Sequence, residues 1–233
     1  MDKITFAAGK ENIIGEILGK DEGKLSNFIY FHGAGRSAKE RAKEFFDESL
    51  FNTVPSIVTF DFSGHGERTG ELKHSSLKQR AHEAQTAIEL YTTKKQLTVC
   101  GSSMGGYIAL KMLSLYDIKN VILFAPALYD KQAFEVPFNQ GFSEIIRRPN
   151  SWGESDVLSS LEKFSGSLLL YIGKQDKVIP HGVIDLIDKH STNTQRKEII
   201  RLDDCDHAIT TWLNNHSDER RQITEKISRY YLT

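Results

Sequence analysis

The sequence predicts an α/β protein in which a mostly parallel sheet carries helices on both faces. Apolar runs of strand length alternate along the chain with stretches that have the periodicity of helices. Polar motifs follow four of the apolar runs, at His32-Gly33, Ser103, Asp176 and His207. Ligands of parallel sheets bind beyond the carboxyl ends of the strands, so we expect these motifs to meet in one site.

Length and composition fit one globular domain, which we predict over residues 1–233. Hydrophobic residues make up 39% of the chain and charged residues 26%, as in proteins with a sizeable core. The net charge of -1 gives no electrostatic reason to expect a nucleic acid partner. No apolar run is long enough for a transmembrane helix, so stable membrane insertion is not expected.

The start of the chain reads as a strand and lacks the apolar region of a signal peptide. The two cysteines, Cys100 and Cys205, do not imply a disulfide framework. We therefore expect a cytoplasmic location.

The N-terminal part of the chain predicts two short strands, then strands that alternate with helices. The run at 28–31 is apolar throughout, as in strands that are buried on both faces. Capping boxes, in which a serine precedes Glu or Gln by three residues, open helices at Ser37 and Ser76. Apolar residues from Leu77 to Tyr91 then keep helical spacing. The strands are expected at 4–7, 13–18, 28–31 and 56–60.

A sharp turn, Gly101-Ser102-Ser103-Met104-Gly105, lies between an apolar run at 97–100 and a helical stretch at 107–115. This strand–turn–helix context makes the G-x-S-x-G pattern specific. The residue at the apex of so tight a turn has a strained backbone, and the flanking glycines avoid clashes. The turn therefore presents the Ser103 hydroxyl at the end of the sheet, whereas Ser102 is expected to be structural.

The C-terminal part of the chain continues the alternation after one interruption. Residues 128–164 contain several aromatic side chains among Pro, Gly and Asn, without a single period. We interpret this segment as an inserted cap over the strand ends; an ordinary crossover helix with long loops is the alternative. Strands are expected at 121–124, 167–172 and 198–202, and helices around 183–187 and from Ser217.

Ser103, Asp176 and His207 have the side chains that nucleophilic catalysis needs. A serine hydroxyl is a poor nucleophile until a base removes its proton, and His207 is the candidate base. A carboxylate must orient the imidazole, and Asp176 is the first candidate; their order along the chain is the one expected of this architecture. The alternative carboxylates, close to His207 in the sequence, are Asp203, Asp204 and Asp206.

Two backbone N–H groups are expected to stabilise the negative charge of a tetrahedral intermediate. One belongs to Met104, directly after the serine, and the other to Ala34, in the loop after the 28–31 strand. Gly33 and Gly35 allow that loop to approach closely.

Together these motifs resemble the α/β-hydrolase superfamily over nearly the whole chain. Within it, the chain is similar to small esterases of the cinnamoyl or feruloyl esterase-like type and to monoacylglycerol lipase-like proteins. The resemblance implies the α/β-hydrolase fold, with an eight-stranded, mostly parallel sheet and a short cap. The motifs that carry it are His32-Gly33-Ala34-Gly35, Asp61-x-x-Gly64-His65-Gly66, Gly101-x-Ser103-x-Gly105, Gly173-x-x-Asp176 and Asp206-His207.

The resemblance also implies roles for individual residues. Ser103 would be the nucleophile, Asp176 the acid and His207 the base, with the oxyanion hole formed by Ala34 and Met104. One departure is Ser63, which stands where many relatives have arginine, so the support of the oxyanion loop is expected to differ. The cap is also short, which leaves acyl-chain selectivity open.

His32 and His65 lie in glycine-rich loops, which we expect them to order by hydrogen bonds rather than by proton exchange. Asp61 is interpreted as a turn-capping carboxylate. No histidine or carboxylate spacing typical of a metal site includes these residues, so neither a metal nor a cofactor is expected.

The sequence therefore predicts a serine hydrolase that cleaves carboxylic esters of small to medium acyl or aromatic acids through an acyl-enzyme. Its partner would be a small-molecule ester, and a homodimer is compatible with the sequence. Thioester hydrolysis, peptidase activity, acyl transfer and perhydrolysis stay open, because they share the acyl-enzyme step. An aminopeptidase needs a carboxylate near the cap, for which Glu135 and Glu144 are candidates. A non-catalytic ligand-binding member of the superfamily is the remaining alternative.

Overall fold

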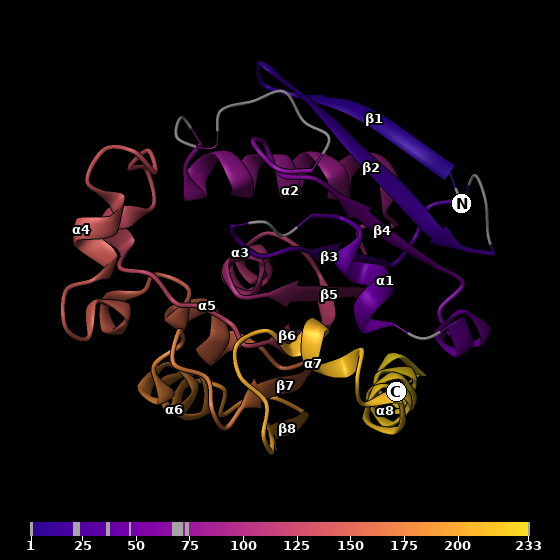
Figure 1. The fold of residues 1–233 in the computed structure, drawn as a ribbon. Helices are drawn as coiled ribbons and strands as arrows, with labels where there is room; N and C mark the ends of the chain where they lie inside the picture. The colour runs from indigo at the N-terminus through magenta and orange to yellow at the C-terminus, as the bar shows by residue number, and fades with distance from the viewer. Residues whose placement is uncertain are drawn as a thin grey trace.

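An eight-stranded sheet crosses the centre of the computed structural model (Figure 1). The structure describes residues 2–20, 24–35, 38–46, 48–66, 72 and 75–232. The strands lie in the order β1-β2-β4-β3-β5-β6-β7-β8. They span β1 Asp2–Ala8, β2 Glu11–Gly19, β3 Phe28–Phe31, β4 Ser56–Phe60, β5 Leu97–Ser102, β6 Ile118–Phe124, β7 Ser167–Gly173 and β8 Arg196–Leu202.

The sheet is parallel from β4 to β8, and only the pairs β1–β2 and β2–β4 are antiparallel. The prediction of a mostly parallel sheet is therefore confirmed. Its central strands β3 and β4 are buried along their whole length, because helices cover both faces. The carboxyl ends of β3, β5 and β7 consequently meet at one edge, where the predicted polar motifs begin.

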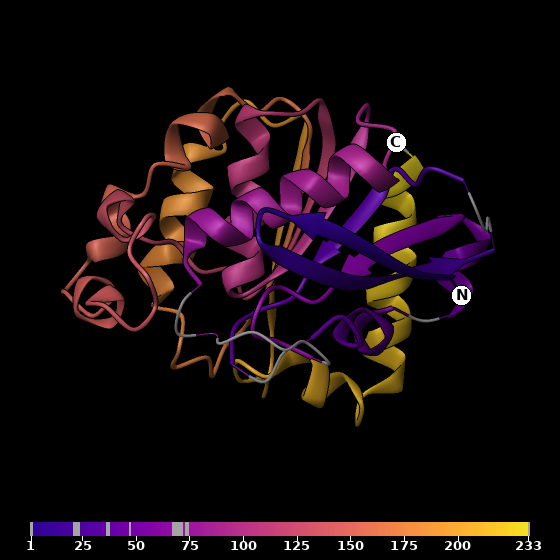
Figure 2. The same cartoon turned by 90° about the horizontal axis from the view of Figure 1, so that it is seen from above.

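Helices cover both faces of the sheet, and each face has helices from both halves of the chain (Figure 2). The ring of Phe28 in β3 contacts Phe46, directly after α1, and Tyr231 of α8 on one face. Helices α2, α3 and α6 lie on the other face. The α-helices are α1 Arg41–Phe45, α2 Leu77–Tyr91, α3 Met104–Lys111, α4 Phe142–Ile146, α5 Leu158–Lys163, α6 His181–His190, α7 Ile209–Leu213 and α8 Ser217–Leu232.

One of the two predicted capping boxes lies fully within the described residues. In α2 the Ser76 hydroxyl accepts a hydrogen bond from the Gln79 amide, as predicted. The first box begins at Ser37, which lies outside the described residues, and α1 begins only at Arg41. As the N-cap residue of α1, Glu40 makes no capping hydrogen bond with its side chain among the described residues, and its carboxylate accepts one from the Lys39 side chain at 2.6 Å.

Short helices fill the stretch between β6 and β7, which we call the β6–β7 segment (residues 125–166). It contains the 3₁₀ helices η4 Lys131–Ala133 and η5 Ser151–Glu154 together with α4 and α5. In Figure 1 α4 lies far from the sheet, at the left. The remaining 3₁₀ helices are η1 Glu48–Asn52 and η3 Met112–Ser114. Of the helices in the described ranges, none has both the length and the apolar content needed to cross a bilayer.

Candidate active site

Ser103 lies at the apex of the turn between β5 and α3, with φ 53° and ψ -117°. A non-glycine residue rarely adopts a positive φ, so this backbone is strained and must be held by its surroundings. The Ser103 amide donates to the Phe124 carbonyl at 2.9 Å, and the Ser103 carbonyl accepts from the amides of Gly106 and Ala127. These bonds to β6 and to the loop after it fix the turn.

The glycines of the turn are required because backbone atoms occupy the space of a side chain. A Cβ on Gly105 would lie 2.2 Å from the Phe31 carbonyl oxygen and 2.5 Å from that of His32. A Cβ on Gly101 would lie 2.3 Å from the Gly105 oxygen. The turn and the loop after β3 are therefore in direct contact, as an oxyanion hole built from both requires.

His207 connects Ser103 to Asp176 by two hydrogen bonds. Its Nε2 lies 3.2 Å from the Ser103 hydroxyl oxygen, and its Nδ1 lies 2.8 Å from Asp176 Oδ2. The Asp176 side chain is fully buried, whereas that of His207 is 27% exposed. An ionised carboxylate only accepts hydrogen bonds, so Nδ1 carries the proton and Nε2 is free to accept from the serine.

The Asp176 carboxylate is held in its ionised form by several donors. Its Oδ1 accepts from the amides of Val178 at 2.7 Å and Ile179 at 2.9 Å. Burial acts to raise the pKa of Asp176, but the hydrogen bonds from His207 and from these amides outweigh it, so the pKa is lowered. The other carboxylates considered as partners of His207 bind elsewhere. Asp203 pairs with Lys174, Asp204 accepts from the Gln175 side chain, and Asp206 accepts from the Ala208 amide.

The amides of Met104 and Ala34 are available to a ligand. Met104 is the first residue of α3, so its amide has no acceptor within the helix. Ala34 is exposed in the loop after β3. Among the residues that the structure describes, no protein acceptor binds either amide.

His32 and His65 are buried, and their contacts agree with the ordering role predicted for them. His32 Nε2 accepts from the Phe62 amide at 3.0 Å, so its Nδ1 donates to the Gly33 carbonyl at 2.7 Å. Burial and the nearby Arg80 lower the pKa values of both histidines, to about 4 for His65. Both rings are therefore neutral near pH 7.

Asp61 joins two loops. Its carboxylate accepts from the Lys39 amide at 2.7 Å and from the Lys39 ammonium at 3.2 Å. A Cβ on Gly66 would lie 2.1 Å from the same carboxylate. Asp61 thus holds the loop that follows β3 against the loop that follows β4.

Arg80 is a residue of this region that sequence reasoning missed. It belongs to α2, is fully buried, and reaches the Gly33 carbonyl and the His65 ring. The sequence does contain a signal for this residue: Arg80 stands three residues after Leu77 and four before Ala84, which places it on the apolar face of the helix. A charged residue on that face indicates a specific buried partner.

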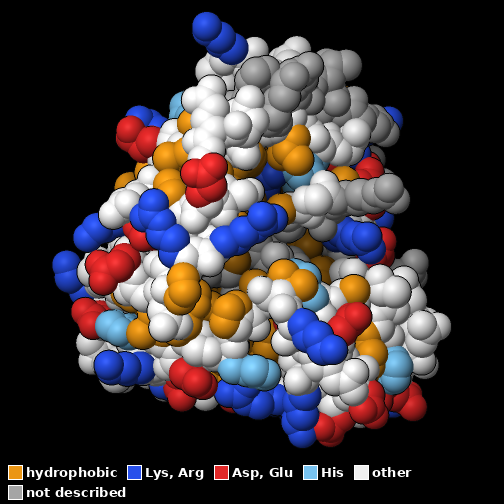
Figure 3. Space-filling model, turned by 60° about the vertical axis from the view of Figure 1, so that its left-hand side comes forward, with side chains coloured by type: hydrophobic (Ala, Val, Ile, Leu, Met, Phe, Trp, Pro, Cys, Tyr) orange, Lys and Arg blue, Asp and Glu red, His pale blue; other side chains and the backbone are white. Residues whose placement is uncertain are grey.

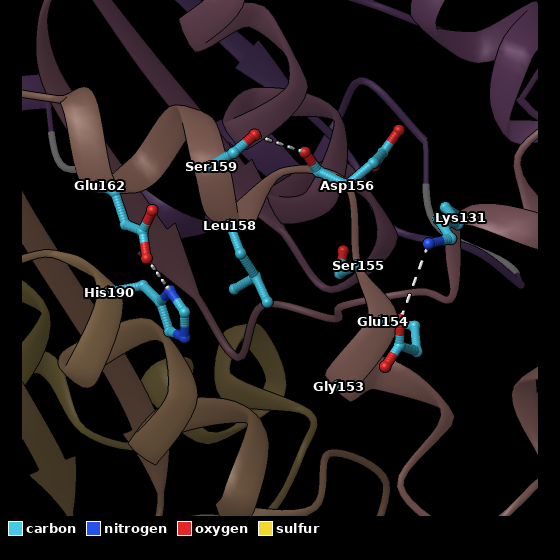
Figure 4. Close-up of a pocket in the computed structure, with 9 residues that line it drawn as sticks. All are labelled: Lys131, Gly153, Glu154, Ser155, Asp156, Leu158, Ser159, Glu162 and His190. Carbon is cyan, nitrogen blue, oxygen red and sulfur yellow. Dashed lines mark hydrogen bonds and ion pairs between the residues drawn. The ribbon is translucent and has the colours of Figure 1, made fainter.

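An open groove of about 360 Å³ lies apart from these residues, between η5, α5 and the end of α6 (Figure 4). Four of its charged side chains pair with one another, His190 with Glu162 at 2.8 Å and Lys131 with Glu154 at 3.7 Å, and Asp156 pairs with Lys111. None of Ser103, Asp176 and His207 lines it. Across the described ranges, no cluster of His, Cys, Asp and Glu suited to a metal ion was found.

Comparison with known families decides the classification. The family model for serine aminopeptidase, S33, matches residues 26–153, more than half of the chain. The chain belongs to this family of serine hydrolases. The match includes Ala34, Ser103 and Met104 but ends before Asp176 and His207, whose relation to Ser103 comes from the structure alone. None of the curated proteins matches the chain.

Solved structures confirm the α/β-hydrolase fold of this serine hydrolase. A protein of Butyrivibrio proteoclasticus with ferulic acid bound has a TM-score of 0.69 and 14% identity, covering 99% of this chain and 100% of that one. An esterase of Exiguobacterium antarcticum has a TM-score of 0.68 and 18% identity, and the match covers 98% of this chain and 99% of that one. A monoacylglycerol lipase of Paleococcus ferrophilus has a TM-score of 0.68 and 18% identity, and the match covers 94% of this chain and 99% of that one.

Proposed function

We propose that this serine hydrolase is an esterase that cleaves carboxylic esters of small to medium acyl or aromatic acids through an acyl-enzyme. Ser103 is the nucleophile, His207 the general base and Asp176 the residue that orients and stabilises the imidazolium. The observation that carries the proposal is the hydrogen-bonded line from Ser103 through His207 to Asp176. The esterase and lipase among the structures of similar fold support an ester as the substrate.

In acylation, the Ser103 oxygen attacks the ester carbonyl while its proton passes to His207 Nε2. Asp176, ionised and buried, stabilises the resulting imidazolium through Nδ1. When the tetrahedral intermediate collapses, the bond to the leaving alcohol breaks and Nε2 returns the proton to that oxygen. Water then attacks the acyl-enzyme from the same side, with Nε2 again taking the proton, and Ser103 is released with the carboxylic acid product.

The negative oxygen of each tetrahedral intermediate is bound by the amides of Ala34 and Met104 in this proposal. Both amides lack a protein acceptor within the described residues, and Gly105 brings their two loops into contact. Loss of one such donor typically costs about 3–4 kcal/mol of transition-state stabilisation.

The β6–β7 segment is proposed to act as the cap and to line the acyl pocket. Its Tyr129 ring contacts Tyr107 of α3, four residues after the serine, and also Phe142. Phe142 in turn contacts Phe138. On the face of the molecule shown in Figure 3, apolar, basic and acidic side chains are interspersed. A face of the molecule without one dominant charge suits an uncharged ester.

Aminopeptidase activity is the second candidate, because the family model carries that description. Binding a substrate ammonium group needs a desolvated carboxylate that is not already paired. Glu135 is 71% exposed and paired with Lys78 at 2.7 Å, and Glu144 is also exposed. Neither predicted carboxylate therefore has the surroundings of an amine-binding site, and the ester remains the favoured substrate.

Labelling by a fluorophosphonate tests the nucleophile. The native protein should form one covalent adduct, mapped to Ser103 by mass spectrometry, and the Ser103→Ala variant should form none. Ser102→Ala is the matched control, since Ser102 is the adjacent serine at the end of β5. The proposal is wrong if labelling persists in Ser103→Ala together with undiminished hydrolysis of p-nitrophenyl esters.

A substrate panel then separates the alternatives that share the acyl-enzyme. We expect kcat/KM to be highest for p-nitrophenyl or aryl esters, lower for the corresponding thioesters, and lowest for aminoacyl p-nitroanilides. Preference for the anilides would replace the esterase assignment by aminopeptidase activity. Tight ligand binding without turnover would instead indicate a non-catalytic member of the family.

A further inference from the structure

Arg80 is a fully buried arginine beneath the loop that carries Ala34. Its guanidinium lies 5.0 Å from the centre of the Phe62 ring and 5.2 Å from that of Phe138. Burial lowers its pKa to about 10, which still leaves it cationic at neutral pH. A buried charge is costly unless strong partners compensate it, so the partners of Arg80 indicate its role.

Those partners are neutral acceptors rather than carboxylates. Arg80 NH2 lies 3.2 Å from both ring nitrogens of His65, and His65 Nδ1 lies 3.3 Å from the Ser63 carbonyl oxygen. Arg80 NH1 lies 3.5 Å from the Gly33 oxygen, a distance at which charge–dipole attraction dominates over hydrogen bonding. Within the described part of the chain, no carboxylate lies at ion-pair distance from Arg80. The nearby Glu83 accepts from the Ser63 amide at 3.1 Å instead.

The Gly33 carbonyl therefore points to the buried side of the loop. It accepts from His32 Nδ1 at 2.7 Å and faces the Arg80 cation. Gly33 is buried, whereas Ala34 is exposed. No cis peptide bond is present in the described residues, so the Ala34 N–H points opposite to the Gly33 carbonyl across the same peptide plane. Holding the carbonyl inward thus directs the N–H outward.

We propose that Arg80 is a positioning residue for ester hydrolysis, which holds the Gly33–Ala34 peptide so that the Ala34 N–H faces the substrate oxyanion. The inference rests on the proposed function, because it assigns Ala34 to the oxyanion hole. The cation also polarises this peptide, since a positive charge at the carbonyl oxygen makes the N–H of the same amide a stronger donor. Arg80 acts through the backbone and does not touch the substrate.

Transition-state analogues separate this role from a purely structural one. A trifluoromethyl ketone adds to the serine and places an oxyanion in the hole, whereas KM for an ester of the same acyl chain reports mainly ground-state binding. We expect Arg80→Met, which removes the charge at similar length, to weaken trifluoromethyl ketone binding at least tenfold. The value of kcat per phosphonate-titrated site should fall by a similar factor, and KM should change less than threefold.

The control is Ile88→Ala, a buried substitution in the same helix but outside the contacts of the loop. It should lower thermal stability yet leave kcat per titrated site and inhibitor affinity unchanged. Arg80→Gln also removes the charge, and if Arg80→Met does not fold, the same measurements on Arg80→Gln test the inference. The inference is overturned if the Arg80 variant binds the inhibitor within twofold of wild type. If the wild-type protein were neither labelled by the phosphonate nor active on esters, the proposed function itself would be wrong.

Discussion

Asp176 accepts a hydrogen bond from His207 on one carboxylate oxygen and two from backbone amides on the other. His207 Nδ1 lies 2.8 Å from Oδ2, while the Val178 and Ile179 amides bind Oδ1. Because the backbone fixes one side of the carboxylate, the orientation of the other side is also set. The imidazole is thereby held in the tautomer whose Nε2 can accept the proton of Ser103.

Replacement of Asp176 by asparagine should remove most of the activity while leaving the fold intact. An amide side chain can donate to Nδ1 and so favour the wrong tautomer of His207, in which Nε2 carries the proton. We expect kcat for a p-nitrophenyl ester to fall by about 10³–10⁴-fold with a small change in KM. Steady-state kinetics, with circular dichroism as the test of folding, measure this effect.

Asp206→Asn provides the comparison, because Asp206 is adjacent to His207 in the sequence but accepts from the Ala208 amide. Its kcat should remain within threefold of wild type. If Asp206→Asn lost activity and Asp176→Asn retained it, the carboxylate that orients His207 would have been assigned wrongly.

The serine turn could be predicted from the sequence because its determinants are local. Gly101 and Gly105 are required by contacts within a few residues and with the neighbouring β3, which the strand–turn–helix pattern implies. Helix α3 nevertheless begins at Met104 rather than near Tyr107, since the turn at Ser103 leads directly into helical backbone. Asp176 and His207 could be predicted as partners because both follow strands of one parallel sheet.

Features that depend on packing between distant elements could not be predicted in the same way. Arg80 meets the loop after β3 only because α2 packs beneath it, and periodicity does not say which loop a helix will touch. The helix α7, Ile209–Leu213, is too short to give a periodic signal. In the β6–β7 segment, helices of three to six residues likewise produce no common period, which explains why its elements were not predicted.

Alanine at Gly105 should destabilise the protein, because the added Cβ would meet the carbonyl oxygens of Phe31 and His32 at 2.2 and 2.5 Å. Backbone atoms cannot rotate away as a flexible side chain can, so the loop after β3 must shift. We expect a loss of about 3 kcal/mol or more in the free energy of unfolding, together with weaker binding of oxyanion analogues. Urea denaturation and trifluoromethyl ketone inhibition measure the two effects.

Gly153→Ala is the matched control for Gly105→Ala, since a Cβ at Gly153 meets no atom within 4 Å and φ there is not positive. Its unfolding free energy should stay within about 0.5 kcal/mol of wild type. Equal stability of the two variants would contradict the close approach of the turn to the loop after β3.

His65 links the stability of the loops around the site to pH. Its side chain is buried against Arg80, and burial together with that cation lowers its pKa from the usual 6.5 to about 4. Between these two values the unfolded chain holds a proton that the folded chain does not. The free energy of unfolding therefore rises with pH in this window and, as pH falls, is lost by about 1.4 kcal/mol per unit from this group.

Replacing His65 by glutamine should remove this contribution, because glutamine stays neutral while its carbonyl can still accept from Arg80. Urea denaturation of both proteins between pH 7 and pH 4 should show the wild type losing up to about 3 kcal/mol more than His65→Gln as the pH falls. The exposed His181 supplies a control, His181→Gln, expected to follow the wild-type curve. Parallel curves for wild type and His65→Gln would mean that His65 is protonated equally in the folded and unfolded chains, contrary to its burial beside Arg80.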